Sequence, residues 1–509
     1  MRPLIEEVTT NCTPESLLHC LSGERGLVVL RSGLFTPAHA RYSLVAVRPF
    51  LTFRSFASRC EVGTGLAPGL NHALRVTEHP SARIQFGNPW HLLDSLMARY
   101  ELLEELDLPF PLGGCFGYWG YDLKNFVEPK LPRHAPNDLE LPDCHVGFYD
   151  SVVIFDHLLQ KVWVVSTGLS SDGSRSEERA RDRLDWWLRL LGRPERSDSP
   201  QAQAGLQRAE GRISSNLSRA DFVARVEAAQ RYIRAGDIYQ VNLAQRLSAP
   251  FRASGAELFA SLTAVSPAPF SAFIDCGDFQ LASSSPELFL RLSGSHVQTR
   301  PIKGTRPRSP DPDRDAQLSY ELQTSPKEMA ELLMITDLLR NDLGRICEYG
   351  SIHVPEMARL ERYPHVQHLV STVEGRLRQD VTHFSAFASC FPGGSISGAP
   401  KYRAMEIIDE LEPVSRGPYT GALGYIGFNR ESQLSITIRT AILKNKIAWY
   451  YAGAGIVADS DPAAEYEETL AKAQGFFQAL CRGRGNESSN FPIPSPPRTA
   501  DLPQPDGPA

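Results

Sequence analysis

The feature that most constrains the fold of this chain is a run of short strand-like segments that follow one another without a helix between them. These segments lie at 270–276, 278–283, 287–292 and 296–302, and a long helical pattern follows at 325–345. Consecutive strands interrupted by occasional helices are typical of α+β proteins, whereas strict alternation of strands and helices builds doubly wound sheets. The sequence therefore predicts an α+β fold with largely antiparallel sheets.

The pattern continues on both sides of this run. A helix is predicted after Ser218, because Ser218 and Asp221 form a capping box and an apolar stripe extends to Ile233. The other expected elements are helices near 90–105, 174–191, 401–411 and 462–481, and strands that include 42–46, 152–156, 421–428, 434–444 and 447–457.

Composition divides the chain into regions. Residues 193–213 lack an apolar period and contain many Pro, Ser, Gln and charged residues, which is typical of a flexible linker. Residues 484–509 are rich in proline and are expected to be disordered. We therefore predict an N-terminal region at 1–192 and a second, catalytic region at 214–483.

Charge and cysteine content exclude several classes of protein. The net charge of −6 gives no electrostatic basis for binding nucleic acid or an anionic membrane, and no apolar stretch reaches 18 residues. The nine cysteines include no CxxC pair, so neither a disulfide framework nor a zinc site is indicated. The N-terminus lacks the basic-then-apolar pattern of a secretory signal. We expect a cytoplasmic protein with no nucleic-acid or membrane partner.

Three charged residues share one face of the predicted helix at 462–481. Asp461 suits the N-cap, and Glu465, Glu468 and Lys472 follow at spacings of three and four. The face could be a solvated surface with a Glu–Lys pair. It could also bind Mg²⁺, which takes one or two carboxylates together with substrate oxygens.

A second carboxylate lies in an apolar setting. Glu331 stands among Ala330, Leu332, Leu333 and Met334 in the helix predicted at 325–345. We expect its side chain to be partly buried, and a buried carboxylate needs a partner or a metal. Chance amphipathicity is the alternative.

Glycine-rich segments occur at two places. Residues 392–401 (PGGSISGAPK) do not have the order of a P-loop, so nucleotide binding is disfavoured, although glycines before a helix can present N–H groups to an anion. Gly453 and Gly455 interrupt an apolar strand and permit close approach of a ligand to the backbone. Turn geometry alone could explain both segments.

One lysine stands among three arginines. Lys303 is close in sequence to Arg300, Arg306 and Arg308. Neighbouring cations favour the neutral, nucleophilic form of an amine. A basic turn that binds an acidic surface is the alternative interpretation.

Taken together, these segments resemble the chorismate-utilising enzymes. The resemblance extends over 215–480 and, more loosely, through 113–122. Its motifs are Ser285-Pro286-Glu287, PIKGTRPR at 301–308, LLRNDLGR at 338–345, HLVS at 368–371, PGGSISGAPK at 392–401 and ADSDPAAEYEETLAK at 458–472. The resemblance implies a fold of two packed, largely antiparallel β-sheets flanked by helices.

The resemblance also implies a set of site residues. Mg²⁺ is the implied cofactor, with Glu331 and Glu468 as ligands and Glu465 as a ligand or neighbouring carboxylate. The residues implied to contact the substrate are His368, Ser395, Tyr419, Arg439, Gly453, Gly455 and Lys472. In a strand over 434–444, Arg439 would share a face with Ser435 and Thr437.

Two positions separate the reactions of this family. Isochorismate and salicylate synthases carry a basic lysine where this chain has Gln240, so addition of water is disfavoured. Anthranilate synthases usually carry a small residue at the position of Lys303, whereas the enzymes that make 4-amino-4-deoxychorismate carry lysine. The resemblance therefore implies that Lys303 adds covalently to chorismate while Glu287 acts as general acid.

The implied second substrate is ammonia. Because the chain contains no recognisable Cys/His/Glu glutaminase triad, a separate glutaminase subunit is the expected partner. One alternative is component I of anthranilate synthase. Another is a non-catalytic subunit that binds an aromatic ligand, which the intact set of Glu287, Lys303, Glu331 and Glu468 argues against.

Overall fold

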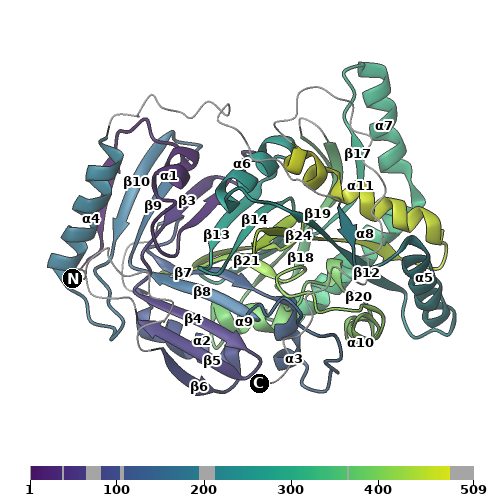
Figure 1. Cartoon of the computed structure of the whole chain (residues 1–509), viewed down its shortest axis with the longest axis horizontal. Coiled ribbons are helices and arrows are strands. Elements are labelled where there is room, and N and C mark those ends of the chain that lie inside the picture. The colour runs from purple at the N-terminus through teal and green to yellow at the C-terminus, as the bar shows by residue number, and fades with distance from the viewer. Residues whose placement is uncertain are drawn as a thin grey trace.

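Two large β-sheets pack against each other, and helices surround them (Figure 1). The computed structural model describes residues 2–36, 39–64, 82–103, 108–193, 213–363 and 366–481. Each sheet has 12 strands, and every strand pair between described residues is antiparallel. The prediction of an α+β fold with two largely antiparallel sheets is confirmed.

The first sheet combines strands from both ends of the chain. Its order is β1 (Leu4–Val8), β10 (Lys161–Ser166), β9 (Ser151–Asp156), β3 (Tyr42–Ala46), β2 (Val28–Arg31), β13 (Phe270–Asp275), β14 (Phe279–Ser285), β23 (Thr440–Lys444), β24 (Ile447–Ile456), β12 (Gln240–Pro250) and β11 (Ser214–Ser215), with β20 (Gly398–Ala399) beside β12.

The second sheet is built in the same mixed way. Its order is β17 (Ile302–Pro307), β19 (Val366–Arg376), β16 (His296–Arg300), β15 (Leu288–Ser293), β22 (Glu431–Ile436), β21 (Ala422–Gly427), β7 (Gly114–Trp119), β8 (Cys144–Tyr149), β4 (Leu51–Phe56), β5 (Arg59–Thr64) and β6 (Arg83–Phe86), with β18 (His353–Arg362) beside β19.

The two regions of the sequence are therefore joined in both sheets. β2 pairs with β13 in the first sheet, and β7 pairs with β21 in the second. Apolar side chains from both sheets form one large core between them, for example Phe53, Phe116, Leu281, Leu290 and Ile442. Residues 194–212 of the predicted linker, and the whole predicted tail at 484–509, lie outside the described residues.

The helices cover the outer faces and the edges of the sheets. They are α1 (Pro14–Cys20), α2 (Pro89–Tyr100), α3 (Lys124–Val127), α4 (Glu177–Leu191), α5 (Arg219–Arg234), α6 (Gly255–Val265), α7 (Pro312–Thr324), α8 (Pro326–Gly344), α9 (His383–Cys390), α10 (Lys401–Leu411) and α11 (Pro462–Cys481), with 3₁₀ turns η1 (Tyr121–Leu123) and η2 (Gly394–Ile396). α4 lies at the opposite end of the molecule from α5, α7 and α11 (Figure 1). Among the described residues, no helix combines the length and apolar character needed to span a bilayer.

Local sequence signals explain where several helices begin. Ser218 accepts a hydrogen bond from the Asp221 amide, and the Asp221 side chain accepts one from the Ser218 amide. The predicted capping box is thus confirmed. The Asp461 side chain likewise accepts from the Ala464 amide, 2.7 Å away, at the start of α11.

The single strand predicted over 434–444 is wrong. The chain leaves the second sheet after Ile436, at the end of β22, and enters the first sheet at Thr440, the start of β23. Arg439 lies in this crossing with φ of +52° and does not share a strand face with Ser435 and Thr437. Apolar alternation continues on both sides of a crossing, so it does not reveal that the chain changes sheets.

Candidate active site

The site is built around two points at which the chain crosses between the sheets. One crossing joins β14 to β15 and contains Glu287; the other joins β22 to β23 and contains Arg439. They lie side by side, since the Ser285 hydroxyl donates to the Ile436 carbonyl at 2.6 Å and the Ile436 amide donates to the Glu287 carbonyl at 3.1 Å. These crossings hold a carboxyl group and a guanidinium at fixed positions between the layers.

The surroundings of Glu287 favour its protonated, acid form. Its side chain is buried and accepts a hydrogen bond from Ser395 of η2. Burial raises the pKa of Glu287 to about 7, although the Ser395 hydrogen bond and the charges of Lys303 and Lys472 oppose the rise. A carboxyl with this pKa is protonated in a large part of the molecules at neutral pH and can donate a proton.

Lys303 lies close to a carboxylate of helix α8. Its Nζ atom is 3.8 Å from Oε2 of Glu331, and both side chains are only 15% exposed. The register of β17 shifts between Lys303 and Thr305, where Gly304 has φ of +67°. This bulge interrupts the regular alternation of side-chain directions along β17 at the position next to Lys303.

The arginines next to Lys303 in the sequence do not surround its amine. Each is paired with a carboxylate: Arg300 with Glu361, Arg306 with Glu328 at 3.4 Å, and Arg308 with Asp315 at 2.9 Å. Each of the three guanidinium charges that the sequence places near Lys303 is therefore engaged by a carboxylate of its own. Lys303 instead acts on Lys472, whose pKa is lowered by burial and by the charge of Lys303 although Glu468 acts to raise it.

Helix α11 and strand β24 form the next part of the site. Lys472 Nζ is 2.6 Å from Glu468 Oε1 and donates to the Gly453 carbonyl at 2.9 Å. The Arg439 guanidinium donates to the Lys472 carbonyl at 2.8 Å. Although burial acts to raise the pKa of Glu468, Lys472 holds that pKa below its usual value. The i,i+4 Glu468–Lys472 pair that the sequence allows is present, with the Lys472 and Glu468 side chains 37% and 47% exposed.

Three carboxylates influence one another electrostatically. Burial raises the pKa of Glu331 and of Glu465, and the charge of Glu468 adds to both rises. Glu465 accepts from the Ser460 hydroxyl at 2.6 Å through Oε1, while its buried Oε2 has no hydrogen-bond partner among the described residues. A buried carboxylate oxygen of this kind is a suitable cation ligand.

These oxygens fit a hard cation that is shared with a substrate. No group of three or more His, Cys, Asp or Glu side chains in the described part of the chain forms a ready-made metal site. Mg²⁺ does not need such a group, since it keeps waters or substrate oxygens besides one or two carboxylates. Glu331 and Glu468, with Glu465 beside them, could therefore hold Mg²⁺ together with a bound carboxylate.

Tyr419 and the two glycines of β24 form one wall. Tyr419 stacks on Tyr451 with ring centroids 5.1 Å apart, and its hydroxyl hydrogen-bonds to the Asn242 side chain. A Cβ atom on Gly453 would lie 2.8 Å from the Tyr419 hydroxyl, and one on Gly455 would overlap the Gln240 amide nitrogen and lie 3.8 Å from Lys303 Nζ. These glycines let polar side chains approach the strand backbone closely.

His368 lies on β19, beside the strand that carries Lys303. A hydrogen bond of 2.9 Å joins its Nδ1 atom to the Thr305 hydroxyl. Burial lowers the pKa of His368, and the charge of Arg439 lowers it further. His368 is therefore a neutral polar group at physiological pH. Among the charged residues expected at the site, Lys303 acts electrostatically on Glu287, Glu331, Glu468 and Lys472, and Arg439 acts on His368 and Lys472.

Two further buried polar atoms belong to the site. The buried Oε1 of Gln240 and the buried Oγ1 of Thr437 have no hydrogen-bond partner among the described residues. Such atoms need a water or ligand partner. The family resemblance pointed to Gln240, whereas the only sequence signal for Thr437 is a polar residue at a position that the structure shows to be buried, which is weak without the structure.

Lys401, the last residue of the glycine-rich segment at 392–401, has a structural role. Lys401 Nζ lies 2.6 Å from Asp342 Oδ2 and donates to the Cys390 carbonyl at 3.1 Å. The lysine thus ties α10 to α8 and does not project from the loop toward an anion. What the segment supplies to the site is Ser395, through η2.

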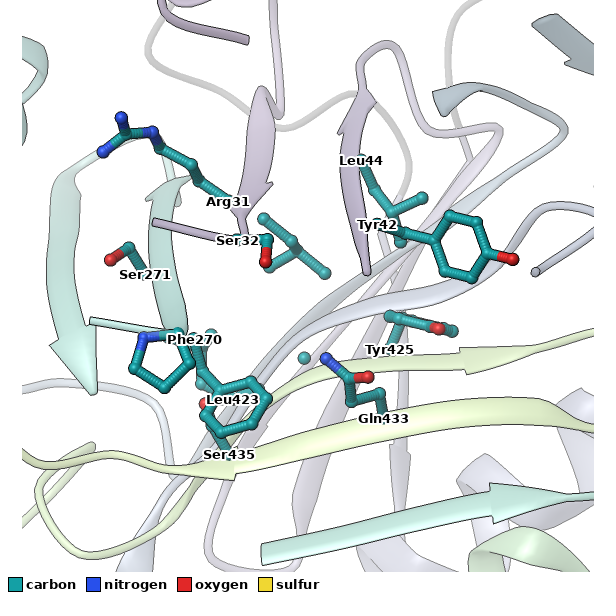
Figure 2. A pocket seen from close by; sticks show the side chains of 13 residues that line it. Arg31, Ser32, Tyr42, Leu44, Phe270, Ser271, Leu423, Tyr425, Gln433 and Ser435 are labelled. Atoms are coloured by element: carbon teal, nitrogen blue, oxygen red, sulfur yellow. Dashed lines mark hydrogen bonds between the residues drawn. The ribbon is translucent and has the colours of Figure 1, made fainter. Parts of the chain in front are cut away.

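A small pocket lies elsewhere in the core. Figure 2 shows it between β2 and β3 of the first sheet and β21 and β22 of the second, lined by residues such as Ser32, Tyr42, Phe270, Tyr425 and Gln433. Arg31 is the only charged residue in the described lining. A pocket is the usual first guess for an active site. Here the paired acid, amine and carboxylates favour the Lys303 cluster instead.

Alanine at Gly455 should reduce activity more than stability. The added Cβ would displace the flexible Gln240 amide and narrow the space beside Lys303 Nζ, whereas at Gly453 it would also meet the Leu243 carbonyl at 2.9 Å. We expect Gly455→Ala to lower kcat/KM by about tenfold or more, and Gly453→Ala to cost about 1–3 kcal/mol of stability as well. Enzyme kinetics and thermal unfolding measure the two effects.

Gly23→Ala is the control for both glycine variants, since its Cβ meets nothing within 4 Å among the described residues. Equal kinetics of Gly455→Ala and wild type would contradict the placement of Gly455 beside Lys303 in the site.

Comparison with known proteins identifies the family to which this chain belongs. The family described as chorismate binding enzyme matches residues 60–478. Anthranilate synthase component 1 of Acetivibrio thermocellus is 39% identical over 444 residues, 87% of each chain. Aminodeoxychorismate synthase component 1 of Klebsiella aerogenes is 40% identical over 462 residues, 90% of this chain and 95% of that one. The crystal structure of anthranilate synthase component I from Streptococcus pneumoniae TIGR4 superimposes with a TM-score of 0.72 at 31% identity, covering 87% of this chain and 93% of that one.

Proposed function

The chain belongs to the chorismate-binding enzymes. Within this family, we propose that it is component I of an aminodeoxychorismate synthase. The reaction converts chorismate and ammonia to 4-amino-4-deoxychorismate in p-aminobenzoate and folate synthesis. The observation that carries the proposal is a shielded amine, Lys303 Nζ, placed 3.8 Å from Glu331 and in the field of the acid Glu287. This combination supports nucleophilic catalysis with proton donation to a leaving group.

In the first step, Lys303 Nζ forms a bond to C2 of the chorismate ring. The ring double bonds shift and the bond from C4 to its hydroxyl oxygen breaks. Glu287 gives its proton to that oxygen, so water leaves. Nζ is then a secondary ammonium attached to C2, and Glu287 is a carboxylate.

In the second step, ammonia forms a bond to C4 and the double bonds shift back. The bond from C2 to Nζ breaks, and its electron pair returns to the lysine amine. The new ammonium at C4 passes one proton to Glu287, which restores the acid. The sum is chorismate plus ammonia giving 4-amino-4-deoxychorismate plus water. The pyruvate unit is retained, so release of p-aminobenzoate needs a separate lyase.

Cationic groups suit the two carboxylates of the substrate. Arg439 and Lys472 are adjacent, and the amides around Gly453 and Gly455 lie on the strand next to them. A guanidinium can form paired hydrogen bonds to a carboxylate, whereas an ammonium acts as a point charge. These four residues thereby orient the ring for attack at C2.

The carboxylates serve the cofactor. Glu331 and Glu468 would hold Mg²⁺, with Glu465 beside them as a further ligand or neighbour. When bound, Mg²⁺ offsets the negative charge of the substrate's ring carboxylate.

Neutral polar groups border the ring. His368 is uncharged because of its burial, Ser395 orients Glu287, and Tyr419 is fixed by its stacking on Tyr451. Gln240 lies beside Lys303 and cannot remove a proton from water, which supports amination over addition of water.

The pH dependence should report Glu287. The acid must be protonated, and its pKa is about 7, so the reactive fraction of Glu287 falls as the pH rises through this value. In a plot of log kcat/KM for chorismate against pH, measured at constant free ammonia, we expect the slope to decrease by about one on passing through about pH 7, and the part above this break is the alkaline limb. Glu287→Gln should lower the rate and remove this limb. A limb that persists in Glu287→Gln would assign it to another group.

Ammonia should come from a separate subunit. We expect the purified chain to form product from ammonium salts at alkaline pH, and from glutamine only after a glutaminase subunit is added. Product formation from glutamine is compared with and without that subunit. Glutamine-dependent turnover by the single chain would contradict the expected partnership.

Anthranilate synthase component I is the second candidate. It is favoured by the anthranilate synthase relatives, which are as similar to this chain as the aminodeoxychorismate synthase relatives are. The deciding experiment is mass analysis of the product from chorismate, Mg²⁺ and ammonium salt. A product that retains the pyruvate unit and yields p-aminobenzoate with a lyase supports our proposal. Anthranilate with free pyruvate would overturn it.

A further inference from the structure

Arg416 is a fully buried cation that the reaction described above does not use. Its side chain is 1% exposed, and its five N–H groups all find acceptors. The acceptors are both carboxylate oxygens of Glu412 at 2.8 and 2.6 Å, the carbonyls of Ile396 at 3.1 Å and Asn242 at 2.7 Å, and the Thr420 hydroxyl at 3.2 Å. Glu412 in turn accepts from the Ala244 amide at 2.9 Å.

Apart from Glu412, these acceptors belong to segments that carry a site residue. Ile396 follows Ser395, the partner of Glu287, and Thr420 follows Tyr419. The Asn242 side chain donates to the same Ile396 carbonyl at 3.1 Å and hydrogen-bonds to Tyr419. Arg416 therefore joins β12, η2 and the segment before β21 at the points where they meet the site.

The N-terminal region supports the other side of this cation. The Arg416 guanidinium lies 4.8 Å from the centre of the Tyr121 ring and 5.6 Å from that of Tyr419, so it is enclosed between two aromatic rings. The Asp122 carboxylate accepts from the Gly417 amide at 3.1 Å, and the Tyr121 amide donates to the Gly417 carbonyl at 2.7 Å. Residues of the N-terminal region thus contact both the guanidinium and the backbone next to it.

We propose that Arg416 is a positioning residue of the reaction, which fixes Ser395 against Glu287 and Tyr419 with Asn242 against β24. The proposal rests on the proposed function only in giving Glu287 the role of acid. A planar guanidinium with five satisfied donors allows one arrangement of its acceptors, whereas a lysine in its place reaches fewer of them.

Arg416 affects catalysis through Ser395, whose hydrogen bond influences the pKa of Glu287. The Ser395 hydrogen bond acts to lower the pKa of Glu287, so a Ser395 that is less well placed leaves Glu287 protonated to higher pH. A loosened Arg416 should therefore move the alkaline limb of the rate profile upward. A role in stability alone would lower the Tm and leave the limb where it is.

The test compares Arg416→Lys, Ser395→Ala and the double variant in the full chain. We expect Arg416→Lys to lower kcat about tenfold or more, to change KM for chorismate by less than about threefold, and to shift the limb to higher pH. In the Ser395→Ala background the same substitution should add little to the shift, because the two residues act through one hydrogen bond. Additive effects, or an unchanged limb, would overturn the proposal.

Two further variants keep the test decisive. Arg41→Lys is the matched control, because Arg41 makes a similar bidentate pair with Asp156, at 3.0 and 2.6 Å, outside the site; it should change Tm without moving the limb. If Arg416→Lys does not fold, Thr420→Val removes one acceptor and should give a smaller shift in the same direction, and no shift would overturn the proposal. Rates are measured as chorismate consumption, which does not depend on the identity of the product. A product other than 4-amino-4-deoxychorismate would therefore overturn the proposed function but not the coupling between Arg416 and Ser395.

Discussion

Replacing Lys303 with alanine is expected to abolish most formation of 4-amino-4-deoxychorismate while binding of chorismate persists. The Lys303 amine is the nucleophile of the first step in our mechanism, and its 15% exposed side chain lies 3.8 Å from Glu331, at the centre of the site. We expect a loss of at least about 100-fold in kcat, which corresponds to about 2.7 kcal/mol of transition-state stabilisation. Because lysine no longer occupies C2, ammonia can add there, and traces of an anthranilate-type product are expected.

Controls separate the covalent role of Lys303 from charge and stability. Lys303→Arg should not restore activity, because guanidinium stays protonated and cannot attack carbon. Lys130→Ala, at an exposed lysine, should behave like wild type. Mass spectrometry of the wild type during turnover should show a substrate-derived adduct on the peptide that contains Lys303. Near-normal rates in Lys303→Ala without any adduct in the wild type would show that ammonia adds directly.

Local signals in the sequence predicted most of the fold. Runs of adjacent strands indicated antiparallel sheets, and cap residues such as Ser218 and Asp461 identified the helix starts that the structure shows. These signals work because turns and caps are decided by neighbouring residues. The pairing of β2 with β13 and of β7 with β21 was not predicted, since it depends on residues hundreds of positions apart.

The errors in the predicted site have the same origin. Arg300, Arg306 and Arg308 are neighbours of Lys303 in sequence, yet each turns to a carboxylate brought in from another segment or a following helix. Arg439 was assigned to a strand face, and the structure places it where the chain passes from one sheet to the other. Sequence proximity does not fix the direction of a side chain once several strands and helices compete for it.

Burial likewise changes the meaning of residues that the sequence leaves ambiguous. Glu465 and Glu468 could have belonged to a solvated helix face, yet Glu465 is 5% exposed and has an unpaired oxygen within the described part of the chain. Glu331, on a distant helix, lies close enough to Glu468 for their charges to act on each other. Three carboxylates gathered from α8 and α11 lie in the field of Lys303, Lys327 and Lys472, each of which lowers the pKa of at least two of them. A substrate that brings two more carboxylates adds negative charge, which a bound cation would offset.

This need for a cation leads to the second large effect, for Glu331→Gln and Glu468→Gln. Each variant removes one negative charge and leaves an amide, which is a weaker ligand for Mg²⁺. Since loss of an outer-shell partner already costs about 10–100-fold in metal affinity, loss of a direct ligand should lower turnover at limiting Mg²⁺ by at least about 100-fold. Removal of Mg²⁺ by a chelator should abolish turnover of the wild type.

The neighbouring Glu467→Gln provides the matched control for this prediction. Glu467 lies on the same helix as Glu468, is 61% exposed and pairs with Arg219 at 3.6 Å, away from Glu331. It should keep the Mg²⁺ dependence of the wild type. Thermal shift with Mg²⁺ and chorismate supplies a second readout, because a lost ligand removes the stabilisation that binding gives while the unliganded Tm stays similar. Glu331→Gln or Glu468→Gln with normal activity at limiting Mg²⁺ would remove that residue from the cation site, and the raised pKa of Glu331 would then report only its burial beside Glu468.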